Sequence, residues 1–375
     1  MFRYPGDSGG SSGNVLITQI FKENGNFTVP KGVKQVDVRI FGGGGGGAST
    51  VNGSTNDFAT AGGGGGWMNN GIINVTPGEV IPITIGKGGN GNFIYAWNAS
   101  AIGESGGTTS FGSYLSAAGG SGGNSTWVKN GYSGQRTIIG GSGGSGGAAA
   151  SLSVDFDISD MTGYPQAFIK PGDGYQFGGG GATDGTWSPS VLNGGGNGGM
   201  WGGGGGFKDC ANNTRYGGFG GQYGGNGYWY YQLAENGTNT MSYTNINENF
   251  RGCGFVNGGN PINAVGTGPQ GHGGGGYGGN GGISIWGAGG GGGYGADGGN
   301  GPNAGCVGGG GGYGKNGYGG EGSIFGAGGG GAYGSGGAAT SVAHDGGGGC
   351  GIHNNNSFKK CGNGASGICI IQYYL

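Results

Sequence analysis

The stretch FGGGGGGAST, residues 41–50, contains six consecutive glycines, and five more follow at residues 62–66. The first run begins directly after KQVDVRIF, residues 34–41, in which apolar valine and isoleucine alternate with charged aspartate and arginine. This period of two is typical of a half-buried β-strand. The run starts where this strand ends. Its glycines are either a flexible linker or themselves the structural material.

Glycine supplies 118 of the 375 residues, against a usual share of roughly 7%. Collagen needs a strict G-X-Y repeat and abundant proline, but this chain has 10 prolines and unbroken glycine runs. Disordered chains are usually charged and poor in aromatic residues, whereas this chain is 9% charged and 11% aromatic. The composition therefore disfavours both collagen and a disordered linker.

An ordered glycine body needs a regular way to satisfy its backbone. Fixing one backbone unit costs roughly 1–2 kcal/mol, and glycine lies at the high end. Polyglycine can form a left-handed helix with three residues per turn and no internal hydrogen bonds, so such helices must bond to neighbours. A run of six glycines spans about 19 Å, the length of an ordinary strand. We therefore expect the runs to pack as rods with loops at both ends.

Apolar segments at the two ends of the chain predict the remaining framework. NVLITQIF (14–21) and FTVP (27–30) read as early strands, and residues 72–75 and 80–85, joined by the turn TPGE, as a β-hairpin. The closing segment GASGICIIQYYL (364–375) is expected to pair with the early strands. The predicted fold class is all-β: an antiparallel β-sandwich framework with a large insertion of packed polyglycine II helices and few or no α-helices.

A glycine run closed by a tyrosine recurs four times in the later part of the chain. The tyrosines are Tyr277, Tyr294, Tyr313 and Tyr333, spaced by 17, 19 and 20 residues. Such a unit cannot bury a face alone, which points to stacked repetition. Each tyrosine is either a wedge at the end of a rod or an exposed ring in a binding loop.

No arrangement of residues predicts an enzyme, a cofactor or a metal site. Matches to glycine-based motifs occur by chance at this glycine content, and no nucleophile lies in a recognisable pattern with a base. Cys350 and His353, with Cys361 and His344 nearby, form only a crude zinc motif. Asp155, Asp157 and Asp160 lack the spacing of a calcium loop. The six cysteines permit three disulfides or six free thiols.

The charge pattern also excludes several partners. The formal net charge is −2 and the 15 lysines and arginines are scattered, so we do not expect nucleic acid to bind. No stretch reaches the roughly 20 apolar residues of a membrane helix. The N-terminal sequence MFRYPGDSGGSSGN lacks the apolar core of a secretory signal, so no signal peptide is predicted.

Aromatic residues between the runs are the best candidates for recognition, because rods without side chains offer little specificity. Trp229, Tyr230 and Tyr231 lie together in GYWYYQ, and Trp97 and Trp127 lie in other connections. Tryptophan and tyrosine suit interfaces because one part of the ring is apolar and another part forms hydrogen bonds. The alternative is that these rings form the core of a glycine body.

Three segments resemble a known family. FKENGNFTVPKGVKQVDVRIFGGGGGG (21–47), INVTPGEVIPITIGKGG (73–89) and the closing GASGICIIQYYL are similar to glycine-rich modules in tail-fibre adhesins of tailed bacteriophages. The resemblance covers nearly the whole chain beyond the first dozen residues. It implies a sandwich of packed polyglycine II helices at a fibre tip, with variable loops that contact a host receptor. Similar modules occur in extracellular parts of some animal receptors, so the fold does not determine the function.

The resemblance also implies a domain organisation and partners. Residues 1–13 would be an N-terminal attachment or flexible segment, and 14–375 a single glycine-rich domain. Within it, 14–89 begins the strand framework, 90–365 is the glycine-rich body and 366–375 is the closing strand. The expected partners are a bacterial outer-surface protein or glycan and other tail-fibre proteins, with a homo-oligomer as a further option. The expected location is the virion tail fibre, outside the cell.

Two other classes of function stay open at this point. One is a structural glycine-rich protein of a bacterial surface or matrix that assembles through unpaired backbone edges. The other is a disordered glycine-rich protein associated with RNA, against which the lack of basic charge argues. The sequence therefore favours a non-enzymatic adhesin that uses Trp229, Tyr230, Tyr231, Trp97 and Trp127.

Overall fold

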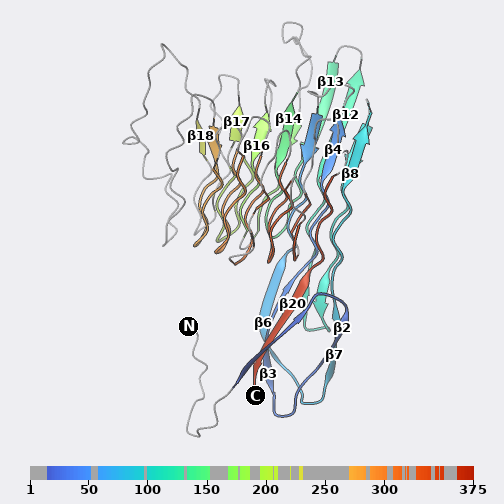
Figure 1. The fold of residues 1–375 in the computed structure, drawn as a ribbon, viewed down its shortest axis with the longest axis vertical. Helices are drawn as coiled ribbons and strands as arrows, with labels where there is room; N and C mark the ends of the chain where they lie inside the picture. Colours follow the sequence, from blue (N-terminus) through green and yellow to red (C-terminus); the bar gives the residue numbers. More distant parts are fainter. Residues whose placement is uncertain are drawn as a thin grey trace, which may run out of the picture.

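The computed structural model describes the chain from Val15 to Leu375 with gaps in the connections (Figure 1). The described residues are 15–51, 58–96, 99–130, 133–152, 168–175, 178–185, 195–205, 207–209, 220, 228–230, 270–283, 288–301, 307–314, 317, 319–320, 327–338, 343–345, 347–349 and 361–375. Within these ranges every regular element is a β-strand, which confirms the predicted all-β class.

Two four-stranded antiparallel sheets form a sandwich at one end of the molecule (Figure 1). The first sheet has the order β1 (Leu16–Phe21), β20 (Ile368–Tyr374), β3 (Gln35–Phe41), β6 (Met68–Asn74). The second has the order β11 (Leu115–Ala117), β10 (Thr109–Phe111), β7 (Val80–Thr84), β2 (Gly25–Thr28). The closing strand therefore lies between two early strands, as the sequence predicts.

Apolar side chains from both sheets form the core between them. The first sheet contributes Val38 of β3 and Ile371 of β20, and the second contributes Phe111 of β10; all three are fully buried. The ring of Phe27 links the two sheets, with its centroid 6.0 Å from that of Phe111 and 5.8 Å from that of Tyr373. This apolar core is the part of the chain that folds by ordinary hydrophobic burial.

The expected hairpin over residues 72–85 is wrong. β6 pairs with β3 in the first sheet, whereas β7 pairs with β2 and β10 in the second. The turn between them crosses from one sheet to the other, and Val29 holds it there because its N–H donates to Glu79 O and its carbonyl accepts from Gly78 N. The Pro-Gly turn signal is the same for both connections, so only packing distinguishes them.

Cys369 gives this core a testable chemical property. The side chain is fully buried, and burial raises the pKa of its thiol to about 12. We expect the native thiol to resist alkylation at pH 8 and to react readily once the protein is unfolded in urea, which mass mapping of the modified peptide would detect. Modification of the native protein at the unfolded rate would contradict this burial.

The same pKa shift predicts how the stability of the protein changes at alkaline pH. The native thiol keeps its proton at pH values where the unfolded thiol, with a pKa of about 8.5, has lost it. The free energy of unfolding therefore falls as the pH rises from the unfolded pKa towards about 12. Cys369→Ala should reduce this dependence of stability on pH.

Beyond the sandwich, the glycine runs form a bundle of rods whose hydrogen bonds have a period of three. The N–H groups of residues 42–47 donate in rotation to three segments, 64–67, 104–107 and 362–365, so that every third N–H reaches the same neighbour. The carbonyls of the run accept N–H groups from three further segments. These are residues 89–92, 120–123 and 349. Six neighbouring segments thus surround the run, and each of them forms hydrogen bonds with its backbone N–H or C=O groups.

Later runs follow the same rule. In residues 308–312, the first and fourth N–H groups donate to Ala288 O and Gly291 O, and the second and fifth donate to Gly320 O and Gly317 O. A period of three is what a helix with three residues per turn requires of its neighbours. The glycine runs are therefore the structural material of an ordered body, and polyglycine II stays our prediction for their conformation.

Strands continue the rods at the end away from the sandwich (Figure 1). One sheet has the order β15 (Phe168–Lys170), β13 (Ser133–Ile139), β12 (Asn124–Asn130), β9 (Ala99–Ile102). A six-stranded sheet has the order β17 (Phe207–Asp209), β16 (Thr183–Gly185), β14 (Ala149–Leu152), β5 (Phe58–Ala61), β4 (Ala48–Val51), β8 (Asn92–Tyr95). β18 (Tyr228–Tyr230) pairs with β19 (Gln270–His272).

Candidate binding surface at the loop-bearing end

We define the loop-bearing end as the row of strands at the far end of the rods, β4, β8, β12, β13, β14, β16, β17 and β18 (Figure 1). Several connections of the chain begin at these strands. They include residues 52–57 between β4 and β5, 153–167 between β14 and β15, and 231–269 between β18 and β19. Connections carried by a rigid scaffold are where binding residues concentrate in many folds.

Buried hydroxyl groups hold the base of this end. Ser49 Oγ of β4 donates to Thr60 Oγ1 of β5 over 2.9 Å, and the hydroxyl oxygens of Thr50 and Ser125 lie 2.7 Å apart. All four side chains are fully buried, and Ser125 Oγ also donates to Ala59 O. Because buried hydrogen-bonded networks have little freedom to rearrange, they fix β12 against β4 and β5.

Small apolar side chains continue this base across the bundle. A buried cluster at the junction of rods and strands consists of Ala148, Ala182, Ala288, Val307 and Ala327, with Phe93 packed against it. Isolated bridges join Ala288 to Val307 and Val307 to Ala327. Alanine and valine allow the backbones to approach nearly as closely as in the glycine runs, so the spacing of the rods carries over into the strands.

The predicted binding residues fall on this end in two groups. Trp229 and Tyr230 lie in β18, where their Cα partners are Gly271 and Gln270 of β19. Trp127 lies in β12 and pairs with Ala99 of β9. Trp97 and Tyr231 lie outside the described residues, Trp97 in the connection that leads into β9 and Tyr231 directly after β18.

The two groups are well separated. β18 contacts β17, and β16, β14 and β5 follow in this order across the sheet. Of these strands, β5 packs against β12. Four strand spacings amount to about 19 Å. Trp127 and Trp229 therefore belong to opposite sides of the loop-bearing end, and these two rings cannot line the same compact pocket.

A second set of aromatic rings lies at the opposite end of the rods, beside the sandwich. Tyr277, Tyr294 and Tyr313 stack in a column, with ring centroids 5.0 and 5.1 Å apart and planes tilted by 14° and 7°. Trp201 meets the column edge-on, 5.3 Å from Tyr277 and 5.9 Å from Tyr294. We call Tyr277, Tyr294 and Tyr313 the tyrosine stack.

The tyrosine stack follows from the repeated Tyr-Gly pair at the end of each run. Gly278, Gly295 and Gly314 have φ values of 70°, 69° and 78°, a region that favours glycine, and each reverses the chain between two rods. The tyrosine side chains are half-buried. Burial is the main cause that raises the pKa of Tyr294, followed by its two ring neighbours. These contacts support the interpretation of the tyrosines as wedges at the rod ends.

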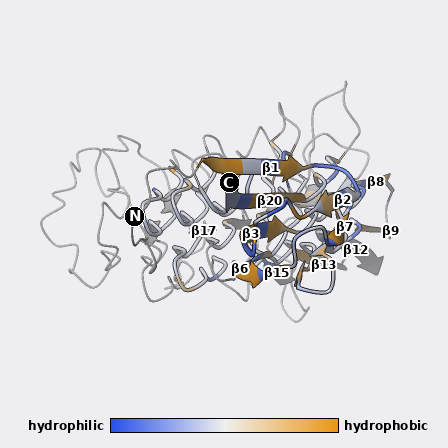
Figure 2. Ribbon diagram, turned by 90° about the horizontal axis from the view of Figure 1, so that it is seen from below, coloured by the Kyte–Doolittle hydropathy of each residue, from blue (hydrophilic) through white to orange (hydrophobic). Residues whose placement is uncertain are grey.

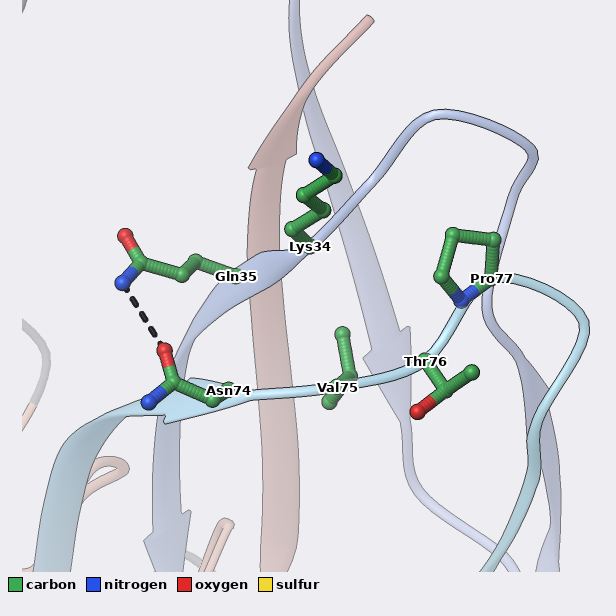
Figure 3. A pocket seen from close by; sticks show the side chains of 6 residues that line it. All are labelled: Lys34, Gln35, Asn74, Val75, Thr76 and Pro77. Carbon is green, nitrogen blue, oxygen red and sulfur yellow. Dashed lines mark hydrogen bonds between the residues drawn. The ribbon is translucent and has the colours of Figure 1, made fainter.

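A shallow hollow at the tip of the sandwich offers few groups that could take part in chemistry. Lys34, Gln35, Asn74, Val75, Thr76 and Pro77 line it (Figure 3). Gln35 Nε2 donates to Asn74 Oδ1 over 2.8 Å, so the two side-chain amides in the hollow are joined by a hydrogen bond across neighbouring strands. Lys34 is its sole ionisable group, which gives no pair for acid–base catalysis.

Metal and disulfide hypotheses fall mostly outside the described residues. Within the part of the chain that the structure describes, no group of three or more histidine, cysteine or acidic residues could hold a metal ion. The acidic cluster at residues 155–160, together with Cys350 and His353, lies outside that part. No helix of sufficient length and hydrophobicity to cross a membrane occurs among the described residues.

An all-β sandwich that carries a bundle of hydrogen-bonded glycine rods defines a glycine-rich structural class. A family model described as a glycine-rich domain matches residues 21–242, more than half of the chain. The protein therefore belongs to this glycine-rich domain family. The comparison with curated proteins gives no match.

Proposed function

We propose that this protein is a non-enzymatic adhesin of a bacteriophage tail-fibre tip that recognises a bacterial outer-surface protein or glycan through its loop-bearing end. The proposal places it in the virion, with other tail-fibre proteins as partners at the sandwich end. The resemblance of residues 21–47 and 73–89 to tail-fibre adhesins motivates this choice, and membership of the glycine-rich family agrees with it.

The observation that carries the proposal is that the two ends of the molecule differ in structure. The sandwich lies at one end, and the strands that bear the long connections lie at the other (Figure 1). Rods without side chains separate the two ends and leave recognition to the connections. A stalk of this kind can vary its connections without disturbing the hydrogen bonds that hold the bundle together.

The separation of the two aromatic groups supports a broad contact rather than a pocket. A glycan chain or the exposed face of an outer-membrane protein offers a surface of that extent. Several copies on one virion would add avidity, so a weak single contact would suffice for attachment.

Alanine replacement of Trp229, Tyr230 and Tyr231 together is expected to abolish binding to host cells, while the fold survives. Removal of aromatic anchors commonly costs 2 kcal/mol or more each, which amounts to roughly thirtyfold per ring. Binding of the labelled protein to a panel of bacterial strains would measure the effect.

A matched control replaces two exposed rings at the sandwich end, Tyr114 and Tyr374, with alanine. This double variant should bind as the unmodified protein does. Normal binding by the triple variant would contradict the site assignment. Filaments that grow with concentration, without binding to any strain, would instead favour the structural surface or matrix protein.

A further inference from the structure

The first strand of the sandwich has an open backbone edge. β1 pairs with β20 on one side and with no described strand on the other. Figure 2 shows it at the margin of the sheet, with hydrophobic residues along it. Its sequence LITQIF contains no charge, proline or glycine. Natural proteins usually protect such edges with charged residues or proline, because an unprotected edge pairs with other chains.

The register with β20 determines which backbone groups are available. Val15 and Leu375 exchange both of their N–H···O bonds, over 3.0 and 3.1 Å. Because antiparallel pairs alternate, the odd-numbered residues of β1 bond to β20 and the even-numbered ones direct N–H and C=O outward. Leu16, Thr18 and Ile20 therefore present three donors and three acceptors at the edge.

The same three residues present their side chains on the outer face of the sheet. Leu16 is 50% exposed and Ile20 52% exposed, with the exposed Thr18 between them. Ile17 and Phe21 point the other way and pack against the sandwich core. The edge is thus a short apolar ribbon that is symmetric about Thr18.

We propose that β1 is a homodimer interface, in which two copies of the chain pair antiparallel through their β1 edges about a two-fold axis at Thr18. Thr18 then opposes Thr18 of the partner subunit, and Leu16 opposes Ile20 of the partner subunit. Each of the opposed pairs exchanges two backbone hydrogen bonds, because all of these residues direct their backbone groups outward.

Side-chain matching favours a second copy over an unrelated strand. With the axis at Thr18, Leu16 and Ile20 of the outer face lie directly opposite each other, and threonine lies opposite threonine, whereas on the inner face Ile17 lies opposite Gln19. Both kinds of cross-strand pair on the outer face are favourable in antiparallel sheets. An axis at the odd-numbered Gln19 would also place side chains of the same face opposite each other. It would, however, put Ile20 opposite threonine and leave Leu16 opposite a residue beyond the end of β1.

The dimer would have a functional consequence. Because the two strands are antiparallel, the rod bodies of the two copies point in opposite directions and present a loop-bearing end at each tip. The pairing itself does not depend on the adhesin function, since it requires neither a cell nor a receptor.

Sedimentation analysis of the whole chain tests this interface. The weight-average mass should double as the protein concentration rises. Thr18→Lys places two like charges opposite each other across the axis and is expected to abolish the doubling. Thr84→Lys, an exposed position in the middle of the second sheet, is the matched control and should dimerise as the unmodified chain does. A monomer at every concentration, or a dimer in Thr18→Lys, would overturn the proposal.

Hydrogen exchange provides a readout that does not depend on a variant. The amides of Ile17, Gln19 and Phe21 should be protected at every concentration, and those of Leu16, Thr18 and Ile20 only where the dimer forms. Protection of the second set that does not change with concentration would mean that another part of the same chain covers the edge, which would also overturn the proposal.

Discussion

Gly45→Ala is expected to destabilise the protein by about 3 kcal/mol or more, or to prevent folding. A Cβ atom at this position would overlap the carbonyl group of Ser121 and come within 2.8 Å of Gly122 N. The backbone cannot retreat, because Gly45 N donates to Gly64 O over 2.9 Å and its carbonyl accepts from Gly349 N over 2.7 Å. Any shift that relieves the overlap therefore weakens bonds to two other rods.

Urea unfolding followed by circular dichroism would measure this loss. Gly71→Ala is the matched control, since a Cβ atom there meets only side-chain atoms at ordinary distances, 3.6 Å from Ile73 Cδ1 and 3.8 Å from Leu115 Cδ2. Its unfolding free energy should be unchanged or higher by about 0.4–1 kcal/mol, because alanine restricts the unfolded chain. Equal stability of the two variants would contradict close packing of the rods.

Phe41→Ala is expected to cost about 3–5 kcal/mol and to uncouple the rods from the sandwich. Phe41 is 1% exposed and ends β3 where the first glycine run begins. Its ring centroid lies 5.9 Å from that of Tyr313 and 5.3 Å from that of Tyr333, two tyrosines at the rod ends. The buried cluster around it also contains Met68 and Ile368 of the sandwich. Removal of the ring leaves a cavity between the two parts.

Unfolding monitored by two probes would detect the uncoupling. Circular dichroism follows the strands. Tryptophan fluorescence follows the seven tryptophans of the chain, among them Trp67, which stacks on Tyr175, and Trp201 beside the tyrosine stack. The two transitions should coincide in the unmodified protein and separate in Phe41→Ala. Tyr374→Ala removes a ring that is 47% exposed on the same sheet, and it should change stability by less than about 1 kcal/mol. A Phe41→Ala variant as stable as this control would contradict the role of the junction.

Much of the framework could be predicted from sequence. The alternation in β3 required one buried face, the apolar closing segment was expected to pair with the early strands, and the structure pairs these two strands directly. The connection after β6 could not be predicted in this way. Residues 76–79 form the same turn in a hairpin as in a crossing between sheets, and the choice depends on Val29, which lies far away in the sequence.

The candidate site was predictable only in kind. Aromatic residues between glycine runs pointed to connections, and the described members, Trp127, Trp229 and Tyr230, do belong to strands of the loop-bearing end. Their division into two groups could not be foreseen, because it depends on the order of strands in the sheet. The tyrosine that recurs after each glycine run predicted stacked repeats, whereas the column of tyrosine rings and the part played by Trp201 emerge only from the packing.

That glycine is the building material of this protein could be inferred from the amino-acid sequence, because the first run follows a strand and the runs leave no side chains to form a core. Which runs are neighbours depends on the tertiary structure. Every glycine run offers the same donors and acceptors and no distinguishing side chain, so residues 42–47 could bond equally well to any of them. Their contact with residues 362–365, at the far end of the chain, is set by the pairing of β3 with β20 in the sandwich.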